Sequence, residues 1–266
     1  MGKNTVSFDF RDSRVVVTGA SGGLGSAIAA AFAGAGASVA LHYRSGRDRA
    51  EAVIAGLPSP GRHVAVGAEA TSESEVALAV GRVREWAGGD GVDVLVNNAG
   101  TYPASPILEL DAAAFSGVVD SSLLAAHLFT RGLAPLMAPG SSIVNVASVE
   151  AHRPARGHAH YAAAKAAMVQ YTRSCALELA RLGIRVNCLS PGLLWRDDLP
   201  AAWPTGYAAW TASCPAGRAG RPEEFAAACL FLASGSASFV NGAELIADGG
   251  ALCVSPQDPA TWSAVR

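Results

Sequence analysis

The sequence predicts an α/β fold in which a doubly wound, mainly parallel sheet of about seven strands carries helices on both faces. Short apolar runs alternate with longer helical patterns along the 266 residues. The predicted strands, such as RVVVTGA (14–20) and VDVLVNNAG (92–100), are apolar throughout, which is typical of parallel strands buried on both faces. Since no linker interrupts the series, we expect residues 1–266 to form a single domain.

The first half of the chain supplies the first four strands. In order, we expect a strand at 14–20, a helix at 25–37, a strand at 38–44, a weak helix at 47–56, a strand at 62–68, a helix at 72–87 and a strand with its turn at 92–100. Gly34 and Gly36 close the first helix. The helix at 72–87 begins with acidic residues and ends with arginines, as the helix dipole favours.

The second half continues the alternation with longer helices. We expect a long helix at 111–137, a strand at 141–148, a second long helix at 158–182, a strand at 184–190, a helix at 222–233 and a last strand and turn at 243–250. The segment 193–217 breaks this pattern and holds three of the five tryptophans. We interpret it as a lid over the substrate, with an irregular pair of surface helices as the alternative.

Composition narrows the class of protein. Half of the residues are hydrophobic (50%) and 16% are charged, so the chain can build a large core. The net charge of −2 and the lack of a basic block argue against nucleic acid or an anionic membrane as partner. Five cysteines, without a C-x-x-C pair, indicate free thiols in a reducing compartment. With no secretory signal and no apolar run long enough to span a bilayer, we expect a cytoplasmic protein that acts on a small molecule.

A glycine-rich turn follows the first predicted strand and opens the first helix. In TGASGGLG (18–25) the spacing is Gly19-x-x-x-Gly23-x-Gly25. Glycines let the backbone approach a pyrophosphate, whose charge sits at the helix N-terminus. The context therefore favours a Rossmann-type dinucleotide site over an ordinary tight turn.

The end of the second strand indicates which dinucleotide is bound. An acidic residue there would hold the ribose hydroxyls of NAD, whereas an arginine suits the extra phosphate of NADP. Here Tyr43 takes the acidic position, and Arg44, Ser45 and Arg47 follow it. We expect NADP(H), with solvated loop arginines as the alternative.

Lys165 and Lys3 are the two lysines of a chain that otherwise uses arginine. Lys165 follows Tyr161 by four residues in YAAAK (161–165), so the two share a helix face. A phenol has an unperturbed pKa of about 10, and a neighbouring ammonium favours the phenolate. We therefore expect Lys165 to lower the pKa of Tyr161 and make it an acid–base group, beside a Ser148 hydroxyl that can hold a carbonyl.

These pieces together resemble the short-chain dehydrogenase/reductase family. TGASGGLG, NNAG (97–100), Ser148, the 13-residue step to YAAAK, RVNCLSPG (185–192) and ASFVNGAELIADGG (237–250) occur in the family's order across nearly the whole chain. The resemblance implies that Ser148 orients the carbonyl, Tyr161 donates the proton, and Lys165 tunes the tyrosine and binds ribose. It also implies a homo-oligomer, a tetramer or dimer, through the long helices at 111–137 and 158–182.

The resemblance assigns further residues to the cofactor site. Asn97 would support the sheet there, and Pro191 and Gly192 would lie against the nicotinamide. The full expected set is Gly19, Ser21, Gly23, Leu24, Gly25, Tyr43, Arg44, Ser45, Glu69, Asn97, Ala99, Gly100, Tyr161, Lys165, Pro191 and Gly192.

Two departures from the family pattern concern the chemistry. Ser122 stands where the family often has an asparagine that holds a relay water for the lysine, and a serine is shorter. WRDD (195–198) replaces the usual threonine after the Pro-Gly pair. We expect Ser122 to serve in the relay and the nicotinamide contacts to be reorganised.

A narrower similarity to the pteridine reductase branch leaves an alternative open. LHYRSG, LVNNAGTYPASPI and SPGLLWRDDLPAAW resemble that branch, in which an aromatic near Tyr102 stacks on a pterin. That branch, however, has an arginine in the glycine loop and an aspartate at the serine position, where this chain has Gly23 and Ser148. We favour hydride transfer between NADP(H) and a ketone or alcohol, over C=N reduction in a pterin or cyclic imine. A non-catalytic nucleotide-binding regulator is the third hypothesis.

Substrate contacts are expected from aromatic side chains. Tyr102, Trp195, Trp203 and Tyr207 could cover a flat or apolar substrate, or else pack on the domain. The histidines of EAHRPARGHAHY, at 152, 158 and 160, lack the spacing of a helical metal pair, so we predict no metal.

Overall fold

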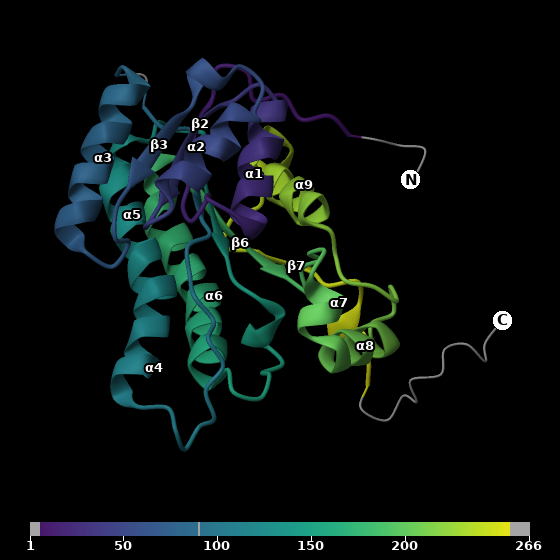
Figure 1. Ribbon diagram of the computed structural model, residues 1–266. Coiled ribbons are helices and arrows are strands. Elements are labelled where there is room, and N and C mark those ends of the chain that lie inside the picture. Colours follow the sequence, from purple (N-terminus) through teal and green to yellow (C-terminus); the bar gives the residue numbers. More distant parts are fainter. Residues whose placement is uncertain (1–5, 90, 256–266) are drawn as a thin grey trace.

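The computed structural model describes residues 6–89 and 91–255, and a sheet of seven parallel strands forms its centre (Figure 1). The strands are β1 Arg14–Val17, β2 Ser38–Tyr43, β3 Val64–Gly67, β4 Val94–Asn97, β5 Ser142–Val146, β6 Arg185–Pro191 and β7 Glu244–Ala247. Their order is β3-β2-β1-β4-β5-β6-β7. The order reverses between β1 and β4, and at such a switch point ligands bind beyond the carboxyl ends of the strands.

Helices cover both faces of this sheet. They are α1 Gly23–Gly34, α2 Arg47–Ala55, α3 Glu73–Ala87, α4 Ala112–Val119, α5 Ala125–Leu133, α6 Ala159–Leu179, α7 Leu199–Ala202, α8 Pro204–Ser213 and α9 Pro222–Ala233. One apolar cluster joins α1, α2 and α9 to the sheet, and a second joins α3, α5 and α6 to it (Figure 1). The predicted doubly wound fold is confirmed.

Alternate residues of each strand enter opposite clusters, which explains the apolar strand sequences. Val15 and Val17 of β1 lie in the first cluster, and Val16 between them lies in the second. The neighbouring β4 does the same with Val94, Leu95 and Val96. A strand buried on both faces has no solvent side on which a polar residue would be favourable.

The predicted single helix over 111–137 is wrong in one respect, because it is interrupted. Between α4 and α5, residues Asp120–Leu124 form a π-helical turn, and a 3₁₀ turn follows α5 at Ala134–Leu136. A π turn inserts an extra residue, and such bulges are frequent at functional sites. Helical periodicity does not reveal it, since the apolar pattern continues through the turn.

The stretch Ala112–Leu136 is also long and apolar enough, by length and composition, to cross a membrane, with a mean hydropathy of 1.4. In this fold its second half, α5, packs on the sheet, and Phe129 and Leu133 lie in the core beside α3 and β4. Packing onto the sheet therefore accounts for the apolar character of α5.

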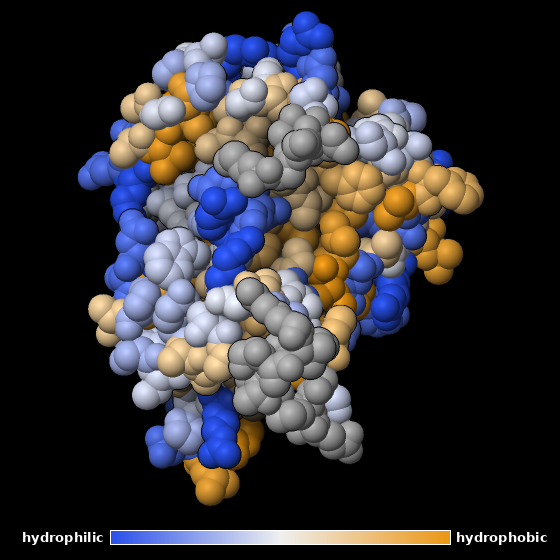
Figure 2. Space-filling model, turned by 90° about the vertical axis from the view of Figure 1, so that its right-hand side faces the viewer, coloured by the Kyte–Doolittle hydropathy of each residue, from blue (hydrophilic) through white to orange (hydrophobic). Residues whose placement is uncertain are grey.

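The segment 193–217 contains two short helices, α7 and α8, which stand beside the end of β7 (Figure 1). Its aromatic side chains pack largely on the segment itself. The Trp195 and Tyr207 rings lie 5.7 Å apart, and the Trp203 ring covers Gly206 so closely that no side chain would fit there. Figure 2 looks onto this side of the molecule, where apolar and polar surface lie side by side. Ile246 of the edge strand β7 is 41% exposed.

Candidate active site

The glycine turn between β1 and α1 is shaped to accept a phosphate group. Gly19 and Gly23 have φ angles of 64° and 57°, in the region that favours glycine. A Cβ on Gly22 or Gly23 would meet nothing within 4 Å, so the surface of the turn is open. The first turn of α1 carries no acidic side chain, which leaves its N–H groups and dipole available to an anion. The turn fits the pyrophosphate of a dinucleotide.

Hydrogen bonds between Thr18, the first residue of the motif, and the loop after β4 hold this turn in place. The Thr18 hydroxyl accepts hydrogen bonds from the backbone N–H groups of Asn98 and Ala99, at 2.9 and 3.0 Å. The Asn98 amide donates to the Thr18 and Gly19 carbonyls at 3.0 and 3.2 Å. The loop after β4 is thereby tied to the glycine turn. The sequence analysis identified NNAG but missed that Thr18 and Asn98 hold the glycine turn in place.

A buried histidine of β2 supports the same turn. The Gly19 N–H donates to His42 Nδ1 at 3.2 Å, and His42 Nε2 lies 3.0 Å from the Ala68 carbonyl. Since the Gly19 amide is a donor, Nδ1 must be the acceptor and Nε2 must carry the proton. Burial lowers the pKa of His42, which favours this neutral form. No motif or periodicity of the sequence pointed to His42.

We predict that Gly25→Ala destabilises the fold by about 1–3 kcal/mol, because an added Cβ would collide with the turn. That atom would lie 2.3 Å from the Gly19 carbonyl oxygen and 2.6 Å from Asn98 Nδ2. Urea unfolding of the cofactor-free protein measures the change. Gly22→Ala is the matched control, since its Cβ would meet nothing within 4 Å; equal stability of the two variants would contradict the steric argument.

The end of β2 presents exposed basic side chains beside a tyrosine. The Tyr43 ring covers Gly67 of β3, where an added Cβ would lie 2.8 Å from the hydroxyl. Arg47 is bound to Glu51 at 2.7 Å, whereas Arg44 is exposed and pairs with no carboxylate of the described residues. Arg44 is therefore the guanidinium most available to a ligand phosphate.

The other predicted cofactor residues lie along the same carboxyl edge of the sheet. Ser21 and Leu24 belong to the glycine turn and α1, and Ser45, Glu69, Ala99, Gly100, Pro191 and Gly192 follow or end β2, β3, β4 and β6. Glu69 accepts hydrogen bonds from the backbone and hydroxyl of Thr71, at 3.2 and 3.0 Å. The Gly192 N–H donates to the Ala247 carbonyl at 2.9 Å, which fixes the Pro-Gly turn on β7.

Ser148, Tyr161 and Lys165 meet where β5 ends and α6 begins. The Ser148 hydroxyl accepts the Glu150 N–H at 3.1 Å, so its own proton can be donated to a substrate oxygen. Lys165 Nζ donates to the Val146 carbonyl at 2.8 Å and lies 5.5 Å from the centre of the Tyr161 ring. The lysine is 4% exposed. The structure thus brings the three predicted side chains together.

The pKa of Tyr161 differs from the expected one. Burial raises the pKa of Tyr161 to about 12, against a smaller lowering by the Ser148 side chain. Lys165 is not among the groups that shift it, and burial lowers the pKa of Lys165 itself to about 8. The predicted lowering of the Tyr161 pKa by the lysine is therefore not found, and burial shifts both groups because desolvation penalises their charged forms. The phenol is protonated at neutral pH, as a proton donor requires.

Ser122 lies in the π-helical turn beside this site. It is fully buried, and its hydroxyl has no hydrogen-bond partner within the described part of the chain. A Cβ on Gly100 would lie 2.9 Å from the Ser122 Oγ and 3.8 Å from Lys165 Nζ, so the two groups flank the same glycine. An unsatisfied buried hydroxyl next to an ammonium is a suitable place for a bound water.

A chain of amide and hydroxyl side chains anchors the helices behind the site. Asn97 Nδ2 donates to Thr130 Oγ1 at 3.0 Å and to Asn145 Oδ1 at 2.8 Å. Asn145 Nδ2 donates onward to Thr172 Oγ1 at 2.9 Å. These bonds connect β4 and β5 with α5 and α6, so they fix the helix that carries Tyr161. Sequence reasoning identified Asn97 and missed the other members.

The expected substrate residues lie in two places. The Tyr102 ring is 59% exposed and lies 5.7 Å from the Tyr161 ring. Trp195, Trp203 and Tyr207 belong to segment 193–217 and, among the described residues, make no ring contact with Tyr161. His158 contacts the Tyr161 ring instead, at 5.9 Å.

The three histidines near the site have separate surroundings. His152 Nε2 is 2.7 Å from Glu244, and His158 Nδ1 is 3.0 Å from Glu150. His160 is fully buried, and neither ring nitrogen has a hydrogen-bond partner among the described residues. The geometry does not bring them together around a common ligand.

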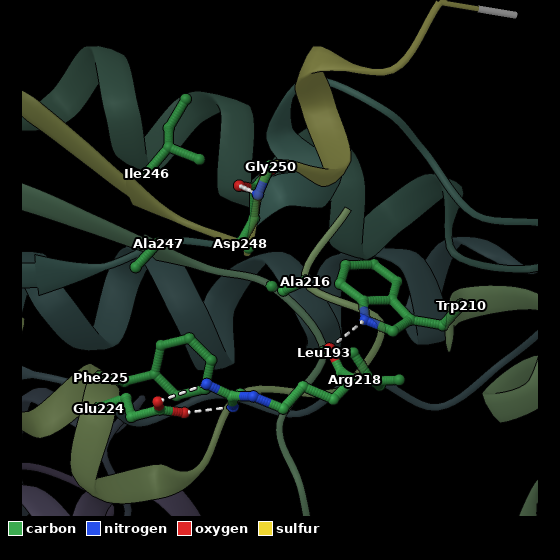
Figure 3. Close-up of a pocket in the computed structure, with 13 residues that line it drawn as sticks. Leu193, Trp210, Ala216, Arg218, Glu224, Phe225, Ile246, Ala247, Asp248 and Gly250 are labelled. Carbon is green, nitrogen blue, oxygen red and sulfur yellow. Dashed lines mark hydrogen bonds and ion pairs between the residues drawn. The ribbon is translucent and has the colours of Figure 1, made fainter. Parts of the chain in front are cut away.

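A cavity of about 340 Å³ lies between segment 193–217, the end of β7 and the start of α9 (Figure 3). Its polar groups already have partners: Arg218 binds both Glu224 oxygens at 2.7 Å, and Asp248 accepts the Gly250 and Leu252 N–H groups. Neither Tyr161 nor Lys165 lines it. We regard it as a packing space behind the Pro-Gly turn and assign it no ligand.

Comparison with known proteins agrees with this geometry. The family model described as enoyl-(acyl carrier protein) reductase matches residues 19–251. A 3-oxoacyl-acyl-carrier-protein reductase (FabG) of Chlamydia pneumoniae is 34% identical over 240 residues, covering 89% of this chain and 96% of that protein.

Two solved structures are similar over the same length. A short-chain dehydrogenase/reductase of Brucella melitensis, described as a glucose/ribitol dehydrogenase, superimposes with a TM-score of 0.87 at 35% identity, covering 92% of this chain and 99% of that one. A short-chain dehydrogenase of Burkholderia cenocepacia in complex with NADP has a TM-score of 0.85 at 33% identity, covering 91% and 99%.

Proposed function

Because the chain belongs to the short-chain dehydrogenase/reductase family, a family of nicotinamide-dependent oxidoreductases, we propose that it transfers hydride between NADP(H) and a ketone or alcohol. The observation that carries the proposal is the meeting of Ser148, Tyr161 and Lys165 at the carboxyl edge of the sheet, beside the glycine turn. The FabG relative is named for the reduction of a 3-oxoacyl group, which supports a carbonyl substrate.

Each side chain of the site has its own role in the proposed reaction. When bound, the nicotinamide cofactor supplies the hydride. Ser148 donates its proton in a hydrogen bond to the carbonyl oxygen, and the Glu150 N–H, which the Ser148 oxygen accepts, orients the hydroxyl. Tyr161, protonated at neutral pH, gives its proton to that oxygen. Lys165 faces the tyrosine ring, and Ser122 beside it would hold the water that returns a proton from solvent.

The preference for NADP(H) rests on the side chains after β2. Tyr43 occupies the position at which a carboxylate would repel a ribose phosphate, and Arg44 is exposed and unpaired within the described residues. The similar Burkholderia cenocepacia structure is a complex with NADP, which supports the same choice.

We predict that Arg44→Ala raises the Kd for NADPH about 10-fold and leaves the Kd for NADH nearly unchanged, because a charge-assisted bond to the ribose phosphate is lost. Fluorescence titration of both cofactors measures this. Arg47→Ala is the matched control, since the Arg47 guanidinium already binds Glu51 at 2.7 Å. Equal weakening of both cofactors by Arg44→Ala would contradict the phosphate contact.

C=N reduction in a pterin or cyclic imine is the second candidate. Tyr102 supports it, because a ring that is 59% exposed beside Tyr161 could stack on a flat substrate. NADPH oxidation followed with a ketone panel and with dihydrobiopterin separates the candidates. Turnover of ketones supports the proposed function, and turnover of dihydrobiopterin without any ketone would replace it by the second.

We also propose that the enzyme is a cytoplasmic homo-oligomer, a tetramer or dimer. Its long central helices expose apolar side chains that a second copy would cover, including Phe115 on α4 (41% exposed) and Leu177 on α6 (81% exposed). Four of the five cysteines, all but Cys253, are buried as free thiols, which suits a reducing compartment.

A further inference from the structure

Glu150 and His158 form a hydrogen-bonded pair beside Tyr161, and the side chains of this pair have no role in the proposed reaction. His158 Nδ1 lies 3.1 and 3.0 Å from the two carboxylate oxygens of Glu150. The His158 and Glu150 side chains are 21% and 19% exposed, respectively. A carboxylate and an imidazole held together at this depth orient each other, and they remain accessible to a small molecule.

The pair contacts both Ser148 and Tyr161. The backbone N–H of Glu150 donates to the Ser148 hydroxyl at 3.1 Å. The ring of His158, the residue that precedes α6, meets the Tyr161 ring edge-on with centroids 5.9 Å apart and an interplanar angle of 73°. His158 and Glu150 therefore lie next to the two side chains that would hold a substrate carbonyl.

The hydrogen-bonding of the pair decides what it can recognise. The Nδ1–H group of His158 donates a hydrogen bond to the Glu150 carboxylate, and Nε2 of His158 has no hydrogen-bond partner within residues 6–89 and 91–255. Nε2 is an acceptor when the ring is neutral and a donor when it is charged. A hydroxyl satisfies Nε2 in both states, because it both donates and accepts. A carboxylate or phosphate would be repelled by Glu150, and an apolar group would leave Nε2 desolvated without a partner.

We propose that Glu150 and His158 form a polar subsite that selects carbonyl substrates with a hydroxyl on the adjacent carbon, that is, α-hydroxy ketones and the vicinal diols formed from them. The inference rests on the proposed function. Hydride goes to the carbonyl carbon, the Tyr161 proton goes to its oxygen, and the adjacent hydroxyl is bound by His158 without reacting. The Tyr102 ring also lies beside the Tyr161 ring, with centroids 5.7 Å apart, and provides an apolar wall for the carbon chain of the substrate.

The test compares hydroxyacetone with acetone, which differ by this one hydroxyl, using the full chain and NADPH. The wild type is expected to show a kcat/KM for hydroxyacetone about 10-fold or more above that for acetone, the effect of one buried hydrogen bond. His158→Leu is expected to lower this ratio about 10-fold, chiefly through the KM for hydroxyacetone. His158→Gln, which keeps a hydrogen-bonding end group, should restore part of it.

His127→Leu serves as the matched control, since His127 is an exposed histidine on α5 that binds the Tyr171 hydroxyl at 3.2 Å, and the ratio should stay at the wild-type value. Thermal unfolding verifies that each variant is folded. Should His158→Leu fail to fold, Glu150→Gln gives the same test, because loss of the carboxylate loosens the imidazole and lowers the ratio.

The outcomes separate this inference from the function on which it rests. Equal kcat/KM for the two ketones in the wild type, or an equal fall for both in His158→Leu, would overturn the subsite and leave carbonyl reduction intact. A wild-type protein that binds NADPH yet reduces no carbonyl compound would overturn the proposed function, and the subsite with it.

Discussion

Replacing Tyr161 by phenylalanine is expected to lower kcat about 100- to 10,000-fold while cofactor binding persists, because the general acid is removed. Phenylalanine preserves the ring that lies against Tyr102 and His158, so the site keeps its shape. The substitution removes the hydroxyl that we propose gives its proton to the carbonyl oxygen. Single-turnover oxidation of NADPH measures the chemical step, and fluorescence titration measures the Kd for the cofactor.

Tyr171→Phe is the matched control on the same helix. The Tyr171 hydroxyl bonds to His127 at 3.2 Å, and burial raises the pKa of this phenol as it does that of Tyr161. If burial of a tyrosine on α6 were sufficient for catalysis, both substitutions would have similar effects. We expect turnover to survive in Tyr171→Phe, and undiminished turnover in Tyr161→Phe would refute the assignment of the proton donor.

Most of the architecture could be predicted because it depends on local patterns. Every expected strand is present within a few residues of its predicted bounds, since a strand buried on both faces must be apolar along its length. The helix at Pro222–Ala233 has the predicted bounds, because a proline at its first position and acidic residues in its first turn mark its start. The π-helical turn at Asp120–Leu124 was missed, since one extra residue leaves the apolar pattern unchanged.

The site was predictable where its residues form a contiguous motif, and not where they act across the sheet. Tyr161 and Lys165 share one turn of helix, so their spacing showed the pair. His42 binds Gly19, 23 residues away, and Thr18 binds the backbone of Asn98, 80 residues away. No local periodicity encodes such bonds. The pairing of His158 with Glu150 was also missed, although the two residues are only eight apart in EAHRPARGHAHY. A loop brings them together, and a loop has no periodicity from which the contact could be predicted.

Lys165→Met is expected to abolish most turnover and yet to stabilise the cofactor-free protein at neutral pH. The ammonium is 4% exposed, and its hydrogen-bond partner is the Val146 carbonyl. No carboxylate of the described residues pairs with it. A buried charge without a counter-ion destabilises a fold, whereas methionine fills a similar volume without a charge. Urea unfolding near pH 7 and a steady-state assay of the same protein measure the two effects.

The dependence on pH has a defined sign. Burial lowers the pKa of Lys165 from 10.5 to about 8 in the folded protein. Between these values the unfolded chain binds the proton and the folded chain does not, so the free energy of unfolding of the wild type rises with pH there. Below pH 8 both states are protonated, and the burial penalty is fully present. The stability advantage of Lys165→Met should therefore be largest below about pH 8 and shrink as the pH approaches 10.5.

Two further substitutions distinguish charge burial from general effects of the helix. Arg173→Met removes an exposed positive charge from α6 and should change neither the stability nor its pH dependence appreciably. Lys165→Arg keeps the charge but cannot lose its proton, and its guanidinium is larger than the ammonium that is buried here at 4% exposure. We therefore expect Lys165→Arg to be both inactive and less stable than the wild type. An active arginine variant, or a methionine variant whose stability advantage does not change with pH, would show that the buried ammonium is not what this position requires.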